Sequence, residues 1–215
     1  MDSQQPSLEA LQDIKRMMER SSRFISLSGL SGLSAGVCAL IGAYIAHFWM
    51  SPNFGEDYPL YSPKTNLIVL ALCVLLAALG SAFYFTWRKA RKNRLPIWDH
   101  SSKKLLINLV IPLATGGLFV AALLYHNEGK LIVPSCLIFY GLTLVNASKY
   151  TLTDIRYLGI LEIILGLVSM IYAEYGLYFW AIGFGLLHIV YGLIMWWKYD
   201  RQPGMGSGQV ERKQE

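Results

Sequence analysis

The sequence predicts an all-α integral membrane bundle of six transmembrane helices with both termini in the cytosol. Three observations support this fold class. Of the 215 residues, 54% are apolar and only 15% are charged, whereas soluble domains carry about 25% charge. The apolar residues gather in long runs separated by polar segments, and the basic residues concentrate on one side of those runs. This composition excludes a soluble globular enzyme, a disordered protein and a disulfide-rich secreted module.

Six apolar runs qualify as membrane spans. A bilayer core about 30 Å thick requires roughly 20 apolar residues in a helix. The runs cover residues 24–48, 66–87, 105–126, 131–148, 157–173 and 176–197, and the fourth and fifth are the shortest. Their apolar character is continuous, which favours helices, because the strand of a membrane barrel would alternate between apolar and polar residues.

The placement of basic residues predicts the orientation. If the N-terminus is cytosolic, every Lys and Arg except Lys64 and Lys130 falls in a cytosolic segment. This distribution agrees with the positive-inside rule, by which cytosolic loops carry an excess of Lys and Arg. The six Trp residues lie at or near span ends or in flanking loops, where indole rings prefer the headgroup region. The first run is too long for a cleaved signal peptide. We therefore expect a multi-pass protein of the inner (plasma) membrane.

Two terminal segments are expected outside the bilayer. Residues 1–23 have apolar side chains at helical spacing opposite a charged face, which predicts an amphipathic cytosolic helix. This helix either lies on the membrane or the basic loop, or docks a membrane or cytosolic protein partner or a second copy of the chain. Residues 198–215 are rich in Gly, Gln and charge and are predicted to be a disordered cytosolic tail.

The cytosolic loop 88–104 is strongly basic. Asp99 is its only acidic residue, and its basic residues are Arg88, Lys89, Arg91, Lys92, Arg94, Lys103 and Lys104. Such a cluster attracts anionic lipid headgroups by about 1 kcal/mol per charge near the surface. We expect it to bind lipid and fix the topology. Nucleic acid is not an expected partner, because no surface of interleaved basic and aromatic residues accompanies the charges.

Glu162 and His188 are the ionisable residues deepest in the predicted spans. Ionisable groups are costly in lipid and mark candidate functional sites. Residues 159–166 and 185–192 share one pattern: a Gly, an ionisable residue three positions later, and a second Gly four positions beyond it. These positions fall on one helix face, and small residues allow two helices to approach closely.

A turn between the fifth and sixth spans would place Glu162 nearly level with His188, and Gly166 level with Gly183. We therefore expect these two helices to pack through their glycine faces, with Glu162 and His188 in reach of each other in the cytosolic half of the bilayer. The pair is interpreted as a structural contact, as a site for protons or a polar solute, or as a metal site, for which two ligands are too few. Further polar candidates for this site are Asn108, Asn146 and Ser31.

The first span carries its own stripe of small residues. Gly29, Gly32 and Gly36 share one face, which predicts a close helix contact within the chain or across a homo-oligomer. Residues 29–32 read Gly-Leu-Ser-Gly, which resembles the Gly-x-Ser-Gly motif of rhomboid intramembrane proteases and implies Ser31 as a nucleophile. The family places this serine on its fourth core helix and has a His-x-x-x-Asn feature, and the chain departs from both. Protease activity is therefore a minor alternative.

The overall sequence pattern, with long apolar runs and short polar segments, resembles that of small uncharacterised polytopic proteins of bacterial inner membranes. The functional expectation is a small transporter, channel or transport accessory subunit that uses the Glu162 and His188 site. One alternative is a non-catalytic scaffold or regulator acting through the N-terminal helix, and a second is an intramembrane enzyme using Ser31 or Glu162 with His188. The chain lacks nucleotide, haem and cysteine-based metal motifs, so a non-enzymatic role without cofactor or metal is favoured.

Overall fold

The computed structural model describes residues 28–50, 63–92 and 100–200. In these ranges the chain is helical and contains no strand, which confirms the all-α prediction for the described part. The predicted N-terminal helix, Arg94 and the middle of the basic loop, and the tail after Asp200 lie outside the described residues.

Five helices are long and apolar enough to cross a membrane. Three are α2 (Gly29–Trp49), α3 (Pro63–Lys92) and α4 (His100–Tyr125). The fourth is α5 (Ile132–Ala147), which a 3-10 turn, η1 (Gly129–Leu131), precedes. The fifth, which we name the terminal helix, covers residues 176–200 and consists of α7 (Gly176–Trp180), η3 (Ala181–Leu187), α8 (His188–Met195) and η4 (Trp196–Asp200). Its end at Asp200 lies three residues beyond the predicted span.

The predicted fifth span corresponds to α6 (Asp154–Ile171), which is not among these five helices because it carries more charged residues than they do in their apolar stretches. Its 18 residues extend about 27 Å. Asp154 and Arg156 occupy its first turn and Glu162 lies in its middle. These three charged residues distinguish α6 from its neighbours.

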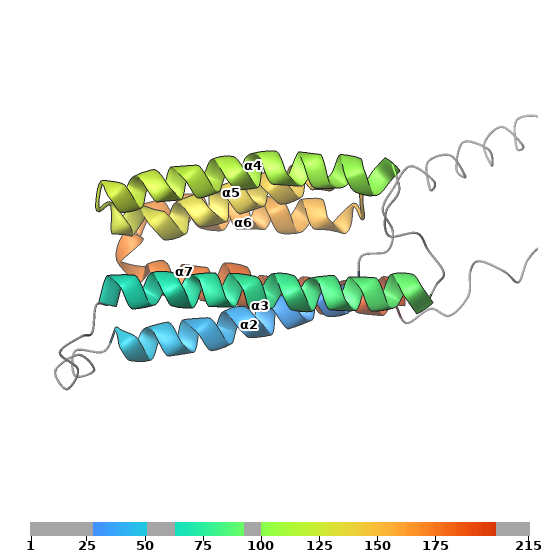
Figure 1. Ribbon diagram of the computed structural model, residues 1–215, viewed down its shortest axis with the longest axis horizontal. Coiled ribbons are helices and arrows are strands. Elements are labelled where there is room, and N and C mark those ends of the chain that lie inside the picture. Colours follow the sequence, from blue (N-terminus) through green and yellow to red (C-terminus); the bar gives the residue numbers. More distant parts are fainter. Residues whose placement is uncertain (1–27, 51–62, 93–99, 201–215) are drawn as a thin grey trace, which may run out of the picture. The chain divides into compact units, whose positions relative to one another are not determined.

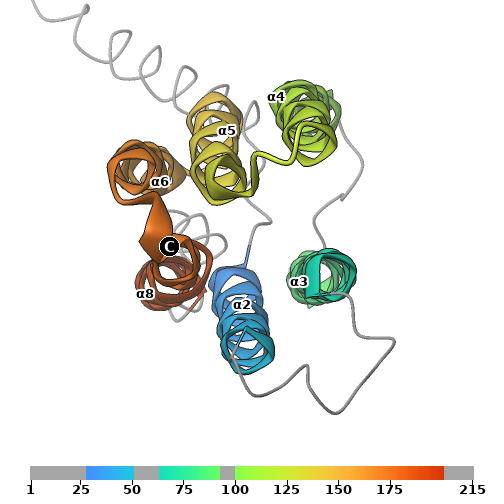
Figure 2. The ribbon, with the colours of Figure 1, turned by 90° about the vertical axis from the view of Figure 1, so that its left-hand side faces the viewer.

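The chain divides into two compact units. The first contains α4, α5 and α6, with α5 between the other two and in contact with both (Figure 2). The second contains α2, α3 as far as Lys89, and the terminal helix, with α2 packed along the terminal helix (Figure 1). Among the described helices, one unit therefore contains three consecutive helices, and the other contains the first two and the last. Two successive groups of three helices, or three hairpins, would have divided the chain differently.

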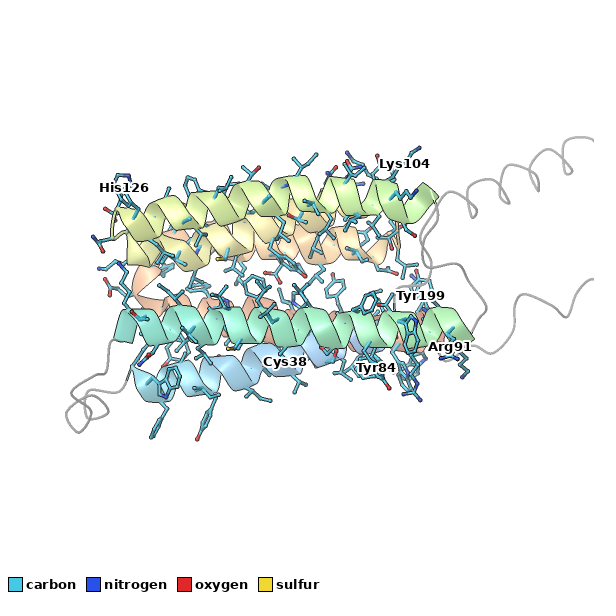
Figure 3. The ribbon with its side chains drawn as sticks, in the orientation of Figure 1. Cys38, Tyr84, Arg91, Lys104, His126 and Tyr199 are labelled. Carbon is cyan, nitrogen blue, oxygen red and sulfur yellow. The ribbon has the colours of Figure 1, made fainter. Side chains whose placement is uncertain are left out.

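Local chemistry explains the turn between α4 and α5. Asn127 adopts a positive φ of 61°, which asparagine tolerates better than most residues. The N–H of Glu128 then donates to the carbonyl of Leu123 at 2.9 Å, which closes the end of α4. The two ends of α4 differ in character: Lys104 lies near its start and His126 just past its end (Figure 3).

Candidate functional site

Glu162 is fully buried in the seam between α5 and α6, with 0% of its surface exposed. Gly159 and Gly166 flank it on the same face of α6. A Cβ at Gly159 would lie 2.7 Å from the carbonyl oxygen of Gly141 on α5, and one at Gly166 would lie 2.7 Å from Ile138. The backbones therefore touch on both sides of the carboxyl group. Tyr140 of α5 is close enough to interact electrostatically with Glu162.

The helices α5 and α6 also carry three hydroxyl side chains near this contact. On α5, Thr143 donates to the carbonyl of Phe139 at 2.7 Å, and Ser135 donates to that of Leu131 at 2.6 Å. Ser169 of α6 is 0% exposed, and its Oγ has no hydrogen-bond partner among the described residues. Sequence reasoning missed these hydroxyls and Tyr140. A signal for Ser169 was available, because it follows Glu162 by seven residues and therefore lies on the same helix face.

His188 lies in the second unit, 7% exposed, at the point where η3 gives way to α8. Its Nδ1 is 2.9 Å from the carbonyl oxygen of Gly183, five residues earlier. A carbonyl only accepts, so Nδ1 carries the proton, and in the neutral ring Nε2 keeps its lone pair. The ring also stacks on Phe184, with centroids 6.1 Å apart. The segment η3 is a π-helix, a wide turn that recurs at functional sites.

The glycines flanking His188 face α2. A Cβ at Gly192 would lie 2.5 Å from the backbone nitrogen of Leu33 and 2.9 Å from the carbonyl oxygen of Gly29. A Cβ at Gly36 would lie 2.7 Å from the carbonyl oxygen of Gly185. The predicted stripe on the first span therefore makes a close contact within the chain. Gly32 belongs to it too, since its Cβ would lie 3.3 Å from the Cα of Gly192.

The expectation that the fifth and sixth spans pack on each other through their glycine faces is wrong. The face of α6 packs on α5, and that of the terminal helix packs on α2. The physical reason is that a glycine face packs best on another small-residue stripe, and Gly141 and the Gly29 stripe supply one inside each unit. Each unit therefore contains one buried ionisable residue between two glycines: Glu162 in the first and His188 in the second.

Asn108 and Asn146 join α4 to α5. The amide of Asn146 donates to the backbone carbonyl of Asn108 at 2.9 Å and lies 3.4 Å from its side-chain oxygen. Pro112, four residues after Asn108 in α4, has no N–H for that carbonyl. Asn146 thus supplies the hydrogen bond that Pro112 cannot. The amide of Asn108 donates to the carbonyl of Lys104 at 2.8 Å.

Ser31 is buried in the second unit, and its hydroxyl donates to the carbonyl of Ser28. A serine nucleophile instead needs to donate its single proton to a base such as histidine. The bond to Ser28 is the kind by which a serine within a helix donates back to a carbonyl three or four residues earlier. Within the described ranges, no group of three His, Cys, Asp or Glu residues is arranged to hold a metal ion.

Comparison with protein families, characterised proteins and solved structures gave no match.

Proposed function

We propose that the chain is a six-span protein of the inner membrane with both termini in the cytosol, and that it acts as a small transporter or transport subunit. Five long apolar helices support membrane insertion. In this arrangement α6 is the fifth span along the chain and adds to the five long apolar helices. Asp154 and Arg156 then lie at the membrane surface, and Glu162 faces α5 rather than lipid. Exposed basic residues such as Arg88, Lys103 and Lys104 would then meet anionic headgroups.

The observation that carries the transport proposal is the burial of the Glu162 carboxyl group between two glycine contacts. A charged group at the centre of a membrane helix costs about 2.5–3.5 kcal/mol on insertion scales. Apolar residues of similar volume often stabilise a buried position at least as well as an ionic group. A carboxyl group at this position is therefore better explained by proton or solute handling than by packing.

The helix packing inside each unit supports the same proposal. Each unit has two helices in backbone contact, which makes that pair stiff, and each carries one ionisable residue on the contact face. Many transporters work by moving stiff helix groups around an intramembrane polar site. We therefore assign Glu162 and His188 the role of proton-exchanging residues.

Proton flux into liposomes tests this assignment. The purified protein is reconstituted around a pH-sensitive dye, and a potassium diffusion potential drives protons inward. We expect flux above that of empty liposomes, and at least a tenfold loss of it in Glu162→Gln and His188→Gln. The matched control is Glu174→Gln, which removes an exposed carboxyl group in the turn before the terminal helix and should keep wild-type flux.

Size-exclusion profiles and circular dichroism separate this role from a structural one. Loss of flux in variants that stay folded and monodisperse supports proton handling. Wild-type flux in both folded variants, or no flux through the unmodified protein, would overturn the proposal for protons.

A further inference from the structure

The carboxylate of Asp200 joins the ends of three helices in the second unit. Its Oδ2 accepts hydrogen bonds from the hydroxyl of Ser28 and from the N–H of Gly29, both at 3.0 Å. Its Oδ1 lies 2.6 Å from the Nζ of Lys89. Ser28 immediately precedes α2, Lys89 lies in the last turn of α3, and Asp200 ends the terminal helix. We name these three side chains the Asp200 cluster.

The chemistry of each contact favours a carboxylate at this position. The N–H of Gly29 is one of the groups at a helix start that have no partner within the helix. The start of a helix also attracts negative charge, and the end of a helix, where Lys89 lies, attracts positive charge. The side chains of Lys89 and Asp200 are only 14% and 11% exposed, so solvent and salt screen this ion pair less than a surface pair.

α3 depends on this cluster more than its neighbours do. From Lys64 to Lys89 it contains no buried residue, and Ala90, next to Lys89, is fully buried. By contrast, α2 and the terminal helix are in backbone contact through their glycines. Val74 packs on Gly42 of α2, where a Cβ would lie 2.5 Å from its Cγ2. Val74 and Lys89 are about 22 Å apart along α3, at 1.5 Å per residue. The basic end of α3, residues 88–92, is therefore held at Lys89 by the Asp200 cluster, next to the buried Ala90.

We propose that the Asp200 cluster is a latch that holds the basic end of α3 against α2 and the terminal helix. When the latch opens, that end of α3 moves away while α2 and the terminal helix stay together. The latch is independent of transport and concerns the conformation of the second unit alone. Its position also has a regulatory implication. Residues 1–27 join the unit at Ser28 and residues 201–215 leave it at Asp200, so a pull on either segment acts directly on the latch.

Spin-label distances in lipid nanodiscs test the latch. Cys38, Cys73 and Cys136 are first replaced by Ala, and labels are placed at the exposed positions Arg88 and Ile194. We expect one narrow distance in the otherwise unmodified chain, and a distance longer by several ångströms or clearly broadened in Asp200→Asn and in Lys89→Met. The matched control is Lys92→Met, which removes an exposed lysine one turn further along α3 and should leave the distance unchanged.

A second label pair, at Val37 on α2 and Val190 on α8, reports on the glycine-packed part of the unit. This distance should stay the same in all variants. An unchanged distance between positions 88 and 194 in both latch variants would overturn the proposal, because the cluster would then be dispensable for holding α3. Equal broadening of both label pairs would overturn it too, because the whole unit would then have loosened.

Discussion

The hydrogen bond from Asn146 to the carbonyl of Asn108 allows a sharp test of how the first unit is held together. Asn146→Ala removes the donor, and Pro112 leaves that carbonyl without the N–H that an ordinary helix residue would provide. Hydrogen bonds between membrane helices contribute about 0.6 kcal/mol on average and up to about 1.7. Leaving a buried acceptor without a partner costs about 1–3 kcal/mol. We therefore expect Asn146→Ala to lower the free energy of unfolding by about 1.5–2 kcal/mol.

Restoring the missing N–H isolates the cause of this loss. In a Pro112→Ala background, residue 112 can donate to Asn108 along the helix, so Asn146→Ala should cost about 1 kcal/mol less there. The measurement is reversible unfolding in mixed micelles, followed by circular dichroism as the denaturing detergent increases, for all four members of the cycle. Asn108→Ala is the control, because it keeps the backbone acceptor and loses the side-chain bond to Lys104 and the 3.4 Å contact of its side-chain oxygen with Asn146. It should cost no more than about 0.5–1 kcal/mol. An equal cost of Asn146→Ala in both backgrounds would refute the reasoning.

Two further predictions concern packing and topology. Gly141→Ala places a Cβ 2.6 Å from the carbonyl oxygen of Gly159, so it should destabilise the protein by about 1–3 kcal/mol in thermal unfolding; Gly117→Ala meets nothing within 4 Å and should be neutral or slightly stabilising. For topology, single cysteines at the exposed positions Glu128 and Lys149 should react with a membrane-impermeant maleimide from the outer and the cytosolic side, respectively, of oriented membranes. Labelling of both from one side would contradict six spans in the proposed orientation.

The helices could be predicted from the sequence because continuous apolar runs leave few alternatives. The first and last residues of the helices were harder to predict. For example, α3 begins at Pro63 and continues to Lys92, beyond the predicted span 66–87. A helix can continue past its apolar run through Arg and Lys residues, because these residues favour helix. The predicted orientation and span count remain predictions.

The partners of each helix were not predictable in the same way. The glycine pattern at 159–166 identified the contact face of α6 correctly, but the pattern does not show which helix packs on that face. Neighbouring position in the chain suggested the terminal helix, and the small residue Gly141 makes α5 the better fit. The role of Asp200 could not be predicted for a related reason. It follows the last apolar run directly and resembles tail sequence, and only the fold brings it to Lys89 and Ser28.

Because of the close glycine contacts, small residues lie in the core and large side chains lie on the outer surface. The core of the described residues is rich in Ala, Ser and Thr, including Ala39, Ala43 and Thr143, while side chains such as Leu76, Phe83 and Leu118 point outward. In a soluble protein the large side chains would fill the interior. Mutational tolerance should be inverted accordingly. Exchanges among large apolar residues on the outer surface should leave the fold intact, whereas one added methyl group on a helix contact face forces two backbones apart.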